Sequence, residues 1–189
     1  MICIIMAGGR SSRLNYIEKP MLMICSKPMI ERVFGTACKI TDKVFVAVSP
    51  YTIKTKRWCL KNNIELIETT GKDYVHDLQL LLNMFKRPVL ILPADTPFIT
   101  DKILLDFLSR TEKISADVIT LLVDRSRFPN ELRALTKEPV GISLFKGAGY
   151  KWSSIVMSDF PELLDIDTIS ELQYARRLCN EISRGVLPI

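Results

Sequence analysis

A glycine loop with basic residues close behind it is the first stretch of this sequence that could do chemistry. Small residues follow a short apolar run and basic side chains come soon after: Ala7, Gly8, Gly9, Arg10, Arg13 and Lys19. Small residues let backbone N–H groups approach an anion closely. Guanidinium and ammonium groups donate charge-assisted hydrogen bonds to phosphate oxygens. The stretch therefore predicts a polyphosphate site rather than a solvated turn, although neither of the two commonest phosphate-binding motifs is present.

Carboxylates at two later points in the chain could hold a metal ion. Asp95 lies in P-A-D-T-P-F after an apolar run, and Asp165 and Asp167 lie in D-I-D-T near the end of the chain. Residues two apart on an extended segment project to the same side, and carboxylate oxygens beside phosphates are typical Mg²⁺ ligands. From position alone, Asp95 is equally compatible with a turn cap. Asp167 is also compatible with the start of a helix, for which Thr168 and Glu171 form a capping box.

Hydroxyl groups and a glycine occur where two further apolar runs end, at Ser49 and at Thr69, Thr70 and Gly71. Hydroxyls and backbone carbonyls there could accept hydrogen bonds from the N–H groups of guanine, although hydroxyls in turns more often cap the local backbone.

His76 is the only histidine, and it lies within a predicted helix. A single histidine argues against Ser-His or Cys-His nucleophilic catalysis, so we expect it to be a surface or interface residue.

The hydrophobic pattern predicts strands that alternate with helices through residue 123. Short apolar runs predict strands at 2–6, 44–48, 64–67, 89–92 and 118–123. Apolar residues at helical spacing predict helices at 28–38 and 74–85, and another from 101, where Asp101 is the expected cap. Residues 52–62 are expected to form a basic surface helix. Beyond these we expect a loop at 124–139 and strands at 140–147 and 152–157. The last helix should bury one face, formed by Ile169, Leu172, Ala175, Leu178 and Ile182.

This alternation predicts an α/β fold, a Rossmann-like and mostly parallel sheet with helices on both faces. We expect residues 1–189 to form a single domain, because the length suits one. Ligands bind such sheets beyond the carboxyl ends of the strands. The candidate residues follow this rule, since each comes directly after a predicted strand: Gly8, Ser49, Thr69, Asp95 and Asp167.

Composition limits the classes of protein to consider. Hydrophobic residues make up 48% of the chain, which is enough for a core. No run approaches the ~20 apolar residues of a membrane span, so we expect none. The five cysteines lack a C-x-x-C pair, which argues against zinc and redox motifs. We expect Cys3 and Cys25 to be core residues and the location to be cytoplasmic. A net charge of +5 suits an anionic ligand, but the scattered basic residues argue against nucleic acid.

The N-terminal motif resembles that of a known family. A-G-G-x-x-x-R followed by K-P is similar to the signature of nucleotidyltransferases related to the molybdenum-cofactor guanylyltransferase, with a departure at Leu14 and Asn15, where many relatives carry Met-Gly. The resemblance implies a nucleotide-diphospho-sugar transferase-like fold. It also implies that Arg13 and Lys19 are catalytic, that Asp95 is a catalytic metal ligand, and that Asp167 is a second Mg²⁺ ligand.

Three further segments resemble a narrower group, the archaeal-type adenosylcobinamide-phosphate guanylyltransferases. They are S-P-Y-T-I-K-T-K at 49–56, T-T-G-K-D-Y-V-H-D-L at 69–78, and F-P-N at 128–130 followed by P-V-G-I-S at 139–143. Ser143 departs from the pattern, because the relatives have asparagine there. P-A-D-T-P-F is a second departure, because this group often has a less typical segment there.

The resemblance implies that GMP passes from GTP to adenosylcobinamide phosphate, with Mg²⁺ as cofactor and GTP and a phosphorylated corrinoid as partners. It leaves a homodimer open. The glycine loop and Arg10 would then bind the phosphates, and Ser49, Thr69, Thr70 and Gly71 would bind the base. Two alternatives remain at this stage: guanylylation or cytidylylation of molybdopterin, and a non-catalytic nucleotide-binding regulator.

Overall fold

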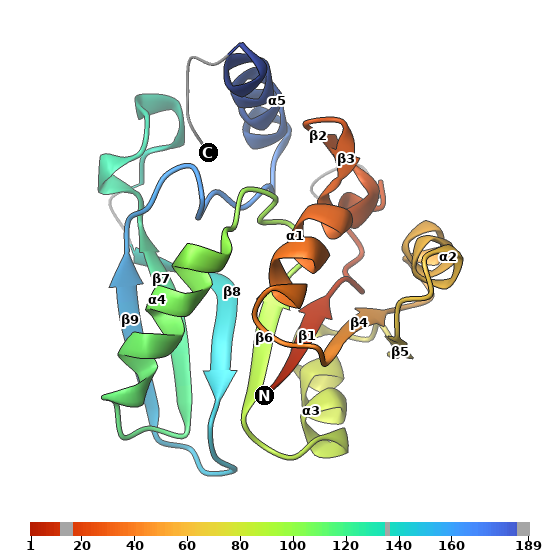
Figure 1. Ribbon diagram of the computed structural model, residues 1–189, viewed down its shortest axis with the longest axis vertical. Coiled ribbons are helices and arrows are strands. Elements are labelled where there is room, and N and C mark those ends of the chain that lie inside the picture. The colour runs from red at the N-terminus through yellow and green to blue at the C-terminus, as the bar shows by residue number, and fades with distance from the viewer. Residues whose placement is uncertain (12–16, 135–136, 185–189) are drawn as a thin grey trace.

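A central sheet organises the computed structural model, which describes residues 1–11, 17–134 and 137–184. Within these residues its strands are β1 (Ile2–Met6), β4 (Val44–Val48), β5 (Leu66–Glu68), β6 (Val89–Pro93), β7 (Val118–Asp124), β8 (Lys137–Phe145) and β9 (Trp152–Met157). Their order is β5-β4-β1-β6-β8-β7-β9 (Figure 1). All neighbouring pairs are parallel except those made by β8, which runs antiparallel to β6 and β7. The predicted mostly parallel α/β sheet is confirmed.

Helices cover both faces of this sheet, as predicted. They are α1 (Met29–Cys38), α2 (Ile53–Lys61), α3 (Tyr74–Met84), α4 (Asp101–Glu112) and α5 (Ile169–Ser183). In β1 the side chains alternate: Cys3 and Ile5 join a buried cluster with α1, α2, α4 and α5, and Ile4 joins a second cluster with α3. Figure 1 shows α1 and α4 on the near side of the sheet.

Short elements complete the described fold. A small hairpin consists of β2 (Met23–Ile24) and β3 (Lys27–Pro28), and the 3₁₀ turns are η2 (Lys19–Met21), η3 (Arg125–Arg127) and η4 (Asn130–Leu132). The last two turns and the start of β8 occupy most of the predicted loop at 124–139. The prediction of a loop was therefore only partly right. Pro129 is compatible with the turn in which it lies, and Pro139 is compatible with the part of β8 that pairs with β7.

The predicted ends of several elements were shifted. Thr100, not Asp101, caps α4, because its backbone is extended and its hydroxyl accepts a hydrogen bond from the Ile103 N–H. The third strand begins at Leu66 rather than at residue 64, because the Ile64 N–H donates to the Cys59 carbonyl at the end of α2.

The last helix begins as expected, with both hydrogen bonds of the Thr168–Glu171 capping box present. Ala175 and Leu178 are buried, and Leu172 and Ile182 pack partly buried against the core. Ile169 is 52% exposed, so its predicted burial was wrong. It is the first residue of the helix, and because helical side chains tilt toward the N-terminus, it has no preceding turn to pack on.

A disulfide joins two distant parts of the chain. Cys25, in the turn between β2 and β3, is bonded to Cys179 in α5 across a sequence separation of 154 residues. Cys25 is only partly buried, so its prediction as a plain core residue was wrong, whereas Cys3 is fully buried. Figure 1 shows the hairpin beside α5. The pairing depends on how these elements pack, which cysteine spacing does not reveal.

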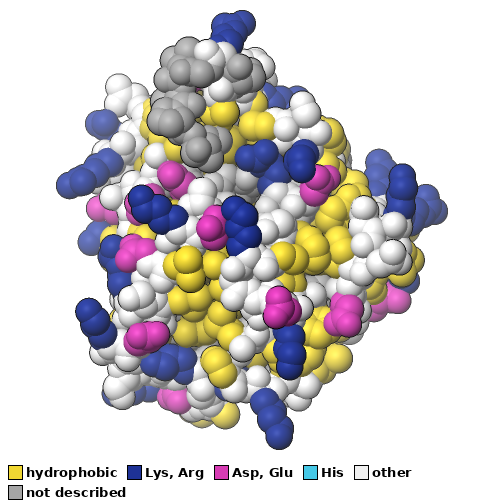
Figure 2. Space-filling view, in the orientation of Figure 1, with side chains coloured by type: hydrophobic (Ala, Val, Ile, Leu, Met, Phe, Trp, Pro, Cys, Tyr) yellow, Lys and Arg dark blue, Asp and Glu magenta, His cyan; other side chains and the backbone are white. Residues whose placement is uncertain are grey.

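The surface gives two further observations. None of the helices in the described ranges is long and apolar enough to cross a membrane. On the face shown in Figure 2, Lys and Arg side chains lie scattered among acidic and apolar ones rather than in one strip. This arrangement agrees with the scatter of basic residues in the sequence.

Candidate active site

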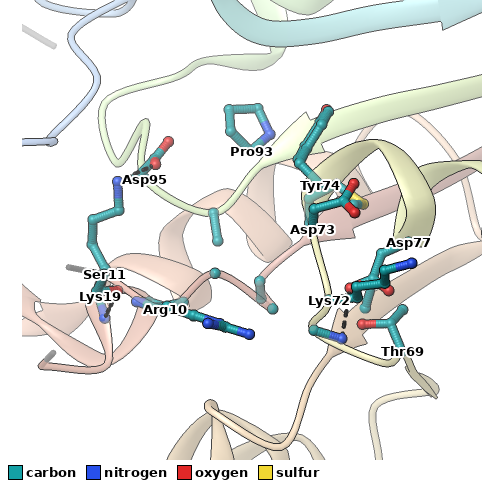
Figure 3. A pocket seen from close by; sticks show the side chains of 18 of the residues that line it. Arg10, Ser11, Lys19, Thr69, Lys72, Asp73, Tyr74, Asp77, Pro93 and Asp95 are labelled. Atoms are coloured by element: carbon teal, nitrogen blue, oxygen red, sulfur yellow. Dashed lines mark hydrogen bonds and ion pairs between the residues drawn. The ribbon is translucent and has the colours of Figure 1, made fainter.

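A cavity of about 710 Å³ opens at the carboxyl edge of the sheet. In the sheet register Met6 at the end of β1 lies opposite Ala47 of β4 and Pro93 of β6, so the loops that follow these strands meet. The walls come from the glycine loop after β1, the segment between β5 and α3, the end of β6 and the approach to α5. In Figure 3, Lys19 and Asp95 lie on one side, Thr69 and Asp77 on the other, and Arg10 between them.

The glycine loop is tightly held on one side and open on the other. A Cβ atom on Gly8 would lie only 3.2 Å from the Ser49 Cβ and 3.3 Å from the Thr69 Oγ1, so a larger residue has little room. The Ser49 hydroxyl donates to the Gly8 carbonyl at 2.7 Å, and the Ala7 N–H donates to the Ala47 carbonyl. By contrast, no described atom lies within 4 Å of a Cβ placed on Gly9. The loop backbone therefore has a free side from which an anion can approach.

Lys19 joins two carboxylates that are far apart in the sequence. Its Nζ lies 2.6 Å from the Asp95 Oδ2 and 2.5 Å from the Asp167 Oδ1, and both carboxylates line the cavity. Burial alone would lower the pKa of the Lys19 ammonium, but the two carboxylates outweigh burial and hold that pKa above its ordinary value. The structure thus brings together three residues that the sequence analysis selected.

Backbone contacts fix the two carboxylate segments against each other. The Ile166 N–H donates to the Asp95 carbonyl at 2.9 Å, which ties the approach to α5 onto the end of β6. The Glu171 carboxylate accepts from the backbone N–H groups of Asp167 and Thr168, each at 2.8 Å. The capping box of α5 therefore also positions Asp167 at the cavity.

Asp165 lies outside this arrangement and is not among the residues that line the cavity. Its carboxylate pairs with the guanidinium of Arg125, which also donates to Glu171 at 3.2 Å. Burial raises the pKa of Asp165 to about 6, because the Arg125 cation offsets the loss of water only in part. Arg125 was not selected from the sequence, since a single arginine in a charged segment has no distinctive spacing.

Asp77 organises the opposite wall and was also missed. Its carboxylate accepts from the Thr70 N–H at 3.1 Å, the Thr70 hydroxyl at 2.7 Å and the Gly71 N–H at 2.9 Å. Burial alone would raise the pKa of Asp77, but hydrogen bonds from Thr70, Thr69 and Gly71 outweigh it and hold the pKa below its ordinary value. Gly71 has a φ of +66°, and a Cβ there would lie 2.8 Å from the Tyr51 ring, which explains the glycine.

The remaining predicted residues lie in different surroundings. Thr69 and Gly71 line the cavity, but the hydroxyls of Ser49, Thr69 and Thr70 all donate to protein acceptors within the walls. Arg10 also lines the cavity, and its guanidinium lies 4.5 Å from the centre of the Tyr51 ring. Arg13 lies outside the described residues.

His76 lies on the outer part of the same wall. Its Nδ1 is 3.2 Å from the Thr70 Oγ1, and its side chain is partly exposed in α3. This position agrees with the expected surface residue.

Chains of known function resemble this one over nearly its whole length. This chain is 29% identical over 194 aligned residues to the adenosylcobinamide-phosphate guanylyltransferase of Methanocaldococcus jannaschii. The alignment covers 94% of this chain and 97% of the relative. A structure of CMP:2-keto-3-deoxy-manno-octonic acid synthetase complexed with CTP superposes with a TM-score of 0.71 at 19% identity, covering 96% of this chain and 98% of the other.

A third similar protein is the molybdopterin-guanine dinucleotide biosynthesis protein A of Archaeoglobus fulgidus, with a TM-score of 0.69 at 16% identity and coverage of 96% and 100%. At such identities the two structural matches speak for the fold alone. They identify the architecture as a nucleotide-diphospho-sugar transferase-like fold. Residues 3–179 match the family described as the MobA-like NTP transferase domain, and the chain therefore belongs to this family of nucleotidyltransferases.

Proposed function

We propose that this chain, as one domain over residues 1–189, transfers GMP from GTP to the phosphate of adenosylcobinamide phosphate. The products are adenosylcobinamide-GDP and pyrophosphate. The observation that carries the proposal is the 29% identity over 94% of the chain to an enzyme named for that acceptor. The segments 49–56 and 69–78 support it, because their resemblance to that group is more specific than the glycine loop shared by the whole family. Residues of 69–78 line the cavity, and Ser49 of the other segment holds the Gly8 carbonyl.

The glycine loop is proposed to bind the triphosphate. The backbone N–H groups of Gly8 and Gly9 and the Arg10 guanidinium would hold the β- and γ-phosphates, and Ala7, which also lines the cavity, would form part of the same nucleotide-binding loop. Arg13 and Lys19 would neutralise the charge that develops at the α-phosphate and on the leaving pyrophosphate. The space beside Gly9, where no described atom lies within 4 Å of an added Cβ, supports this placement of the phosphates. The acceptor phosphate is already anionic, so it can attack the α-phosphorus in line without a side-chain base, and positioning supplies much of the catalysis.

Asp95 and Asp167 are the proposed Mg²⁺ ligands. Oxygens of both carboxylates converge on one cation, the Lys19 ammonium, at 2.6 and 2.5 Å. Within the described chain no group of three or more His, Cys, Asp or Glu residues is arranged so that it could hold a metal ion by itself. Mg²⁺ at nucleotide sites is typically held by one or two carboxylates together with substrate phosphates, so this donor set fits. When bound, Mg²⁺ would supply positive charge to the phosphate oxygens.

The wall held by Asp77 is the proposed site for the base. Thr69 and Gly71 line the cavity there, and the nearby hydroxyls of Ser49 and Thr70 fix the backbone whose carbonyls would accept from guanine N1 and N2. Adenine presents an acceptor at N1, so a backbone arranged for guanine would leave polar groups unpaired. Each unpaired buried group costs about 1–3 kcal/mol. We therefore propose a preference for GTP over ATP and CTP. Separately, we propose a cytoplasmic location, in which the Cys25–Cys179 disulfide would be unusual.

Two measurements test the proposal. Calorimetry with GTP, ATP and CTP tests the base: two mismatches should weaken ATP binding by about 10²- to 10⁴-fold, and comparable affinity for ATP would contradict the argument. Product analysis with adenosylcobinamide phosphate and with molybdopterin tests the acceptor. Turnover of molybdopterin alone would move the function to the alternative acceptor. Absence of pyrophosphate release with either acceptor would favour a non-catalytic nucleotide-binding protein.

A further inference from the structure

Glu18 caps the first turn of α2 from outside that helix. Its Oε1 accepts from the Lys54 N–H at 2.8 Å, and its Oε2 accepts from the Thr55 N–H at 2.9 Å and from the Thr55 hydroxyl at 3.1 Å. Lys54 and Thr55 are the second and third residues of α2. The N–H groups of a first helical turn have no partner within the helix, so Glu18 provides acceptors from 36 and 37 residues away.

The helix needs this external carboxylate because its own cap residue is engaged elsewhere. Thr52 precedes α2, and among the described contacts its side chain makes no capping hydrogen bond. Its hydroxyl instead accepts from the Ser49 N–H at 2.9 Å and lies 3.2 Å from the Ser49 carbonyl, in the turn after β4. The negative charge of Glu18 also suits the positive end of the helix dipole.

Glu18 is joined directly to Lys19, whose ammonium reaches Asp95 and Asp167. The Met21 N–H donates to the Glu18 carbonyl and the Leu22 N–H to the Lys19 carbonyl, both at 3.0 Å, so the backbone from 18 to 22 is one short turn. A shift of Glu18 would therefore move the base of the Lys19 side chain. We propose that Glu18 is a positioning residue for Lys19: by clamping η2 to the start of α2, it sets where the ammonium lies in the cavity.

This inference rests on the proposed function for its kinetic test. Glu18→Ala should lower kcat by about 10- to 100-fold, because a displacement of about 1 Å at a reacting group can cost about 100-fold. The KM for GTP should change less, since the glycine loop is untouched. Glu18→Gln should recover part of the loss, because its carbonyl oxygen can still accept one backbone N–H.

A double-mutant cycle separates positioning from general stabilisation of α2. If Glu18 acts through Lys19, Glu18→Ala should lower kcat little further in a Lys19→Met background. A purely structural role predicts the same fold-loss in both backgrounds, which would overturn the inference. Asn62→Ala is the matched control, because the Asn62 side chain donates to the Trp58 carbonyl at the other end of α2. It should leave kcat within about twofold.

A second readout needs no turnover. In the wild-type protein the Lys19 side chain is 17% exposed and paired with two carboxylates, so an amine-acylating reagent should modify it slowly. We expect Glu18→Ala to speed labelling at Lys19 several-fold, measured by mass spectrometry, while labelling at Lys72 stays unchanged. Unchanged labelling at Lys19 would refute the positioning role. If the wild-type protein transfers no GMP, the proposed function fails, and the labelling result still decides the role of Glu18.

Discussion

Replacing Lys19 by methionine removes the cation that joins Asp95 to Asp167, and we expect the free protein to lose stability that Mg²⁺ then restores. Methionine keeps much of the length of the side chain, so the change is mainly one of charge. Without the ammonium, the two carboxylates that converge on one point lose the cation that lies between them. A divalent cation bound to both would put positive charge back at that point.

The size of the effect follows from the exposure of the three side chains. Removing one partner of a buried ion pair costs about 3–5 kcal/mol, whereas exposed pairs contribute about 0–1 kcal/mol. Lys19, Asp95 and Asp167 are 17%, 21% and 35% exposed, which places this site between the two limits. We therefore expect the free energy of unfolding at pH 7 to fall by about 1–3 kcal/mol. Mg²⁺ at 100 times its Kd would return about 2.7 kcal/mol.

Urea unfolding with EDTA and with saturating Mg²⁺, and without nucleotide, measures both effects. Mg²⁺ should stabilise Lys19→Met more than the wild-type protein, in which the ammonium competes for the same carboxylates. Lys72→Met is the control, because Lys72 lines the same cavity and its replacement also removes one positive charge. The reasoning would be refuted if Mg²⁺ stabilised Lys19→Met no more than the wild-type protein. It would also be refuted if Mg²⁺ stabilised Lys19→Met no more than Lys72→Met.

Three further predictions concern other parts of the structure. Asp95→Asn should abolish Mg²⁺-dependent transfer while calorimetry without metal still detects GTP; unchanged activity with the same Mg²⁺ dependence would mean that the metal is held elsewhere. Asp77→Asn should lower the free energy of unfolding by about 1–3 kcal/mol at pH 7, because the new amide faces N–H donors. The folded-state pKa of Asp77 lies below its ordinary value of 3.8, so its contribution is complete above that pH and declines as the pH falls through and below it. The difference in free energy of unfolding between the wild-type protein and Asp77→Asn, measured with urea, should therefore be smaller near pH 3 than at pH 7. An equal difference at the two pH values would contradict this. Cys25→Ser should cost about 2–5 kcal/mol in non-reducing buffer, with Cys38→Ser nearly neutral; a loss that persists in reductant would rule out the disulfide as its cause.

Much of the site's location can be predicted from residues that are close together in the sequence. The run 2–6 is apolar and β-branched, and the glycines follow at once, so a strand that ends in an anion-binding loop could be predicted from neighbouring residues alone. Asp95 follows β6 in the same way. Because parallel strands present their carboxyl ends at one edge, the order of elements was enough to predict that these residues share a cavity.

The partners of each polar side chain depend on the tertiary structure. Lys19 and Asp167 are separated by 148 residues, and their contact needs η2 and the approach to α5 to lie together. Asp165, only two residues away, instead faces Arg125 of η3. The sequence separates these two aspartates only by the capping box that follows Asp167 and by the family resemblance, and neither predicts the Arg125 partner of Asp165.

The contacts that hold the walls are likewise decided by packing. In the sequence, nothing separates Asp77 from the other polar residues of α3. Its role depends on the tertiary structure, in which the backbone N–H groups of Thr70 and Gly71 donate to its carboxylate. Glu18 resembles a solvated charge until the unpaired N–H groups of α2 are placed against it. The Cys25–Cys179 bond needs the hairpin and α5 to be neighbours. Hydrophobic periodicity determines which elements form, because it acts between residues close in sequence, whereas these hydrogen bonds, ion pairs and the disulfide need atoms placed within a few ångströms by the packing of distant elements.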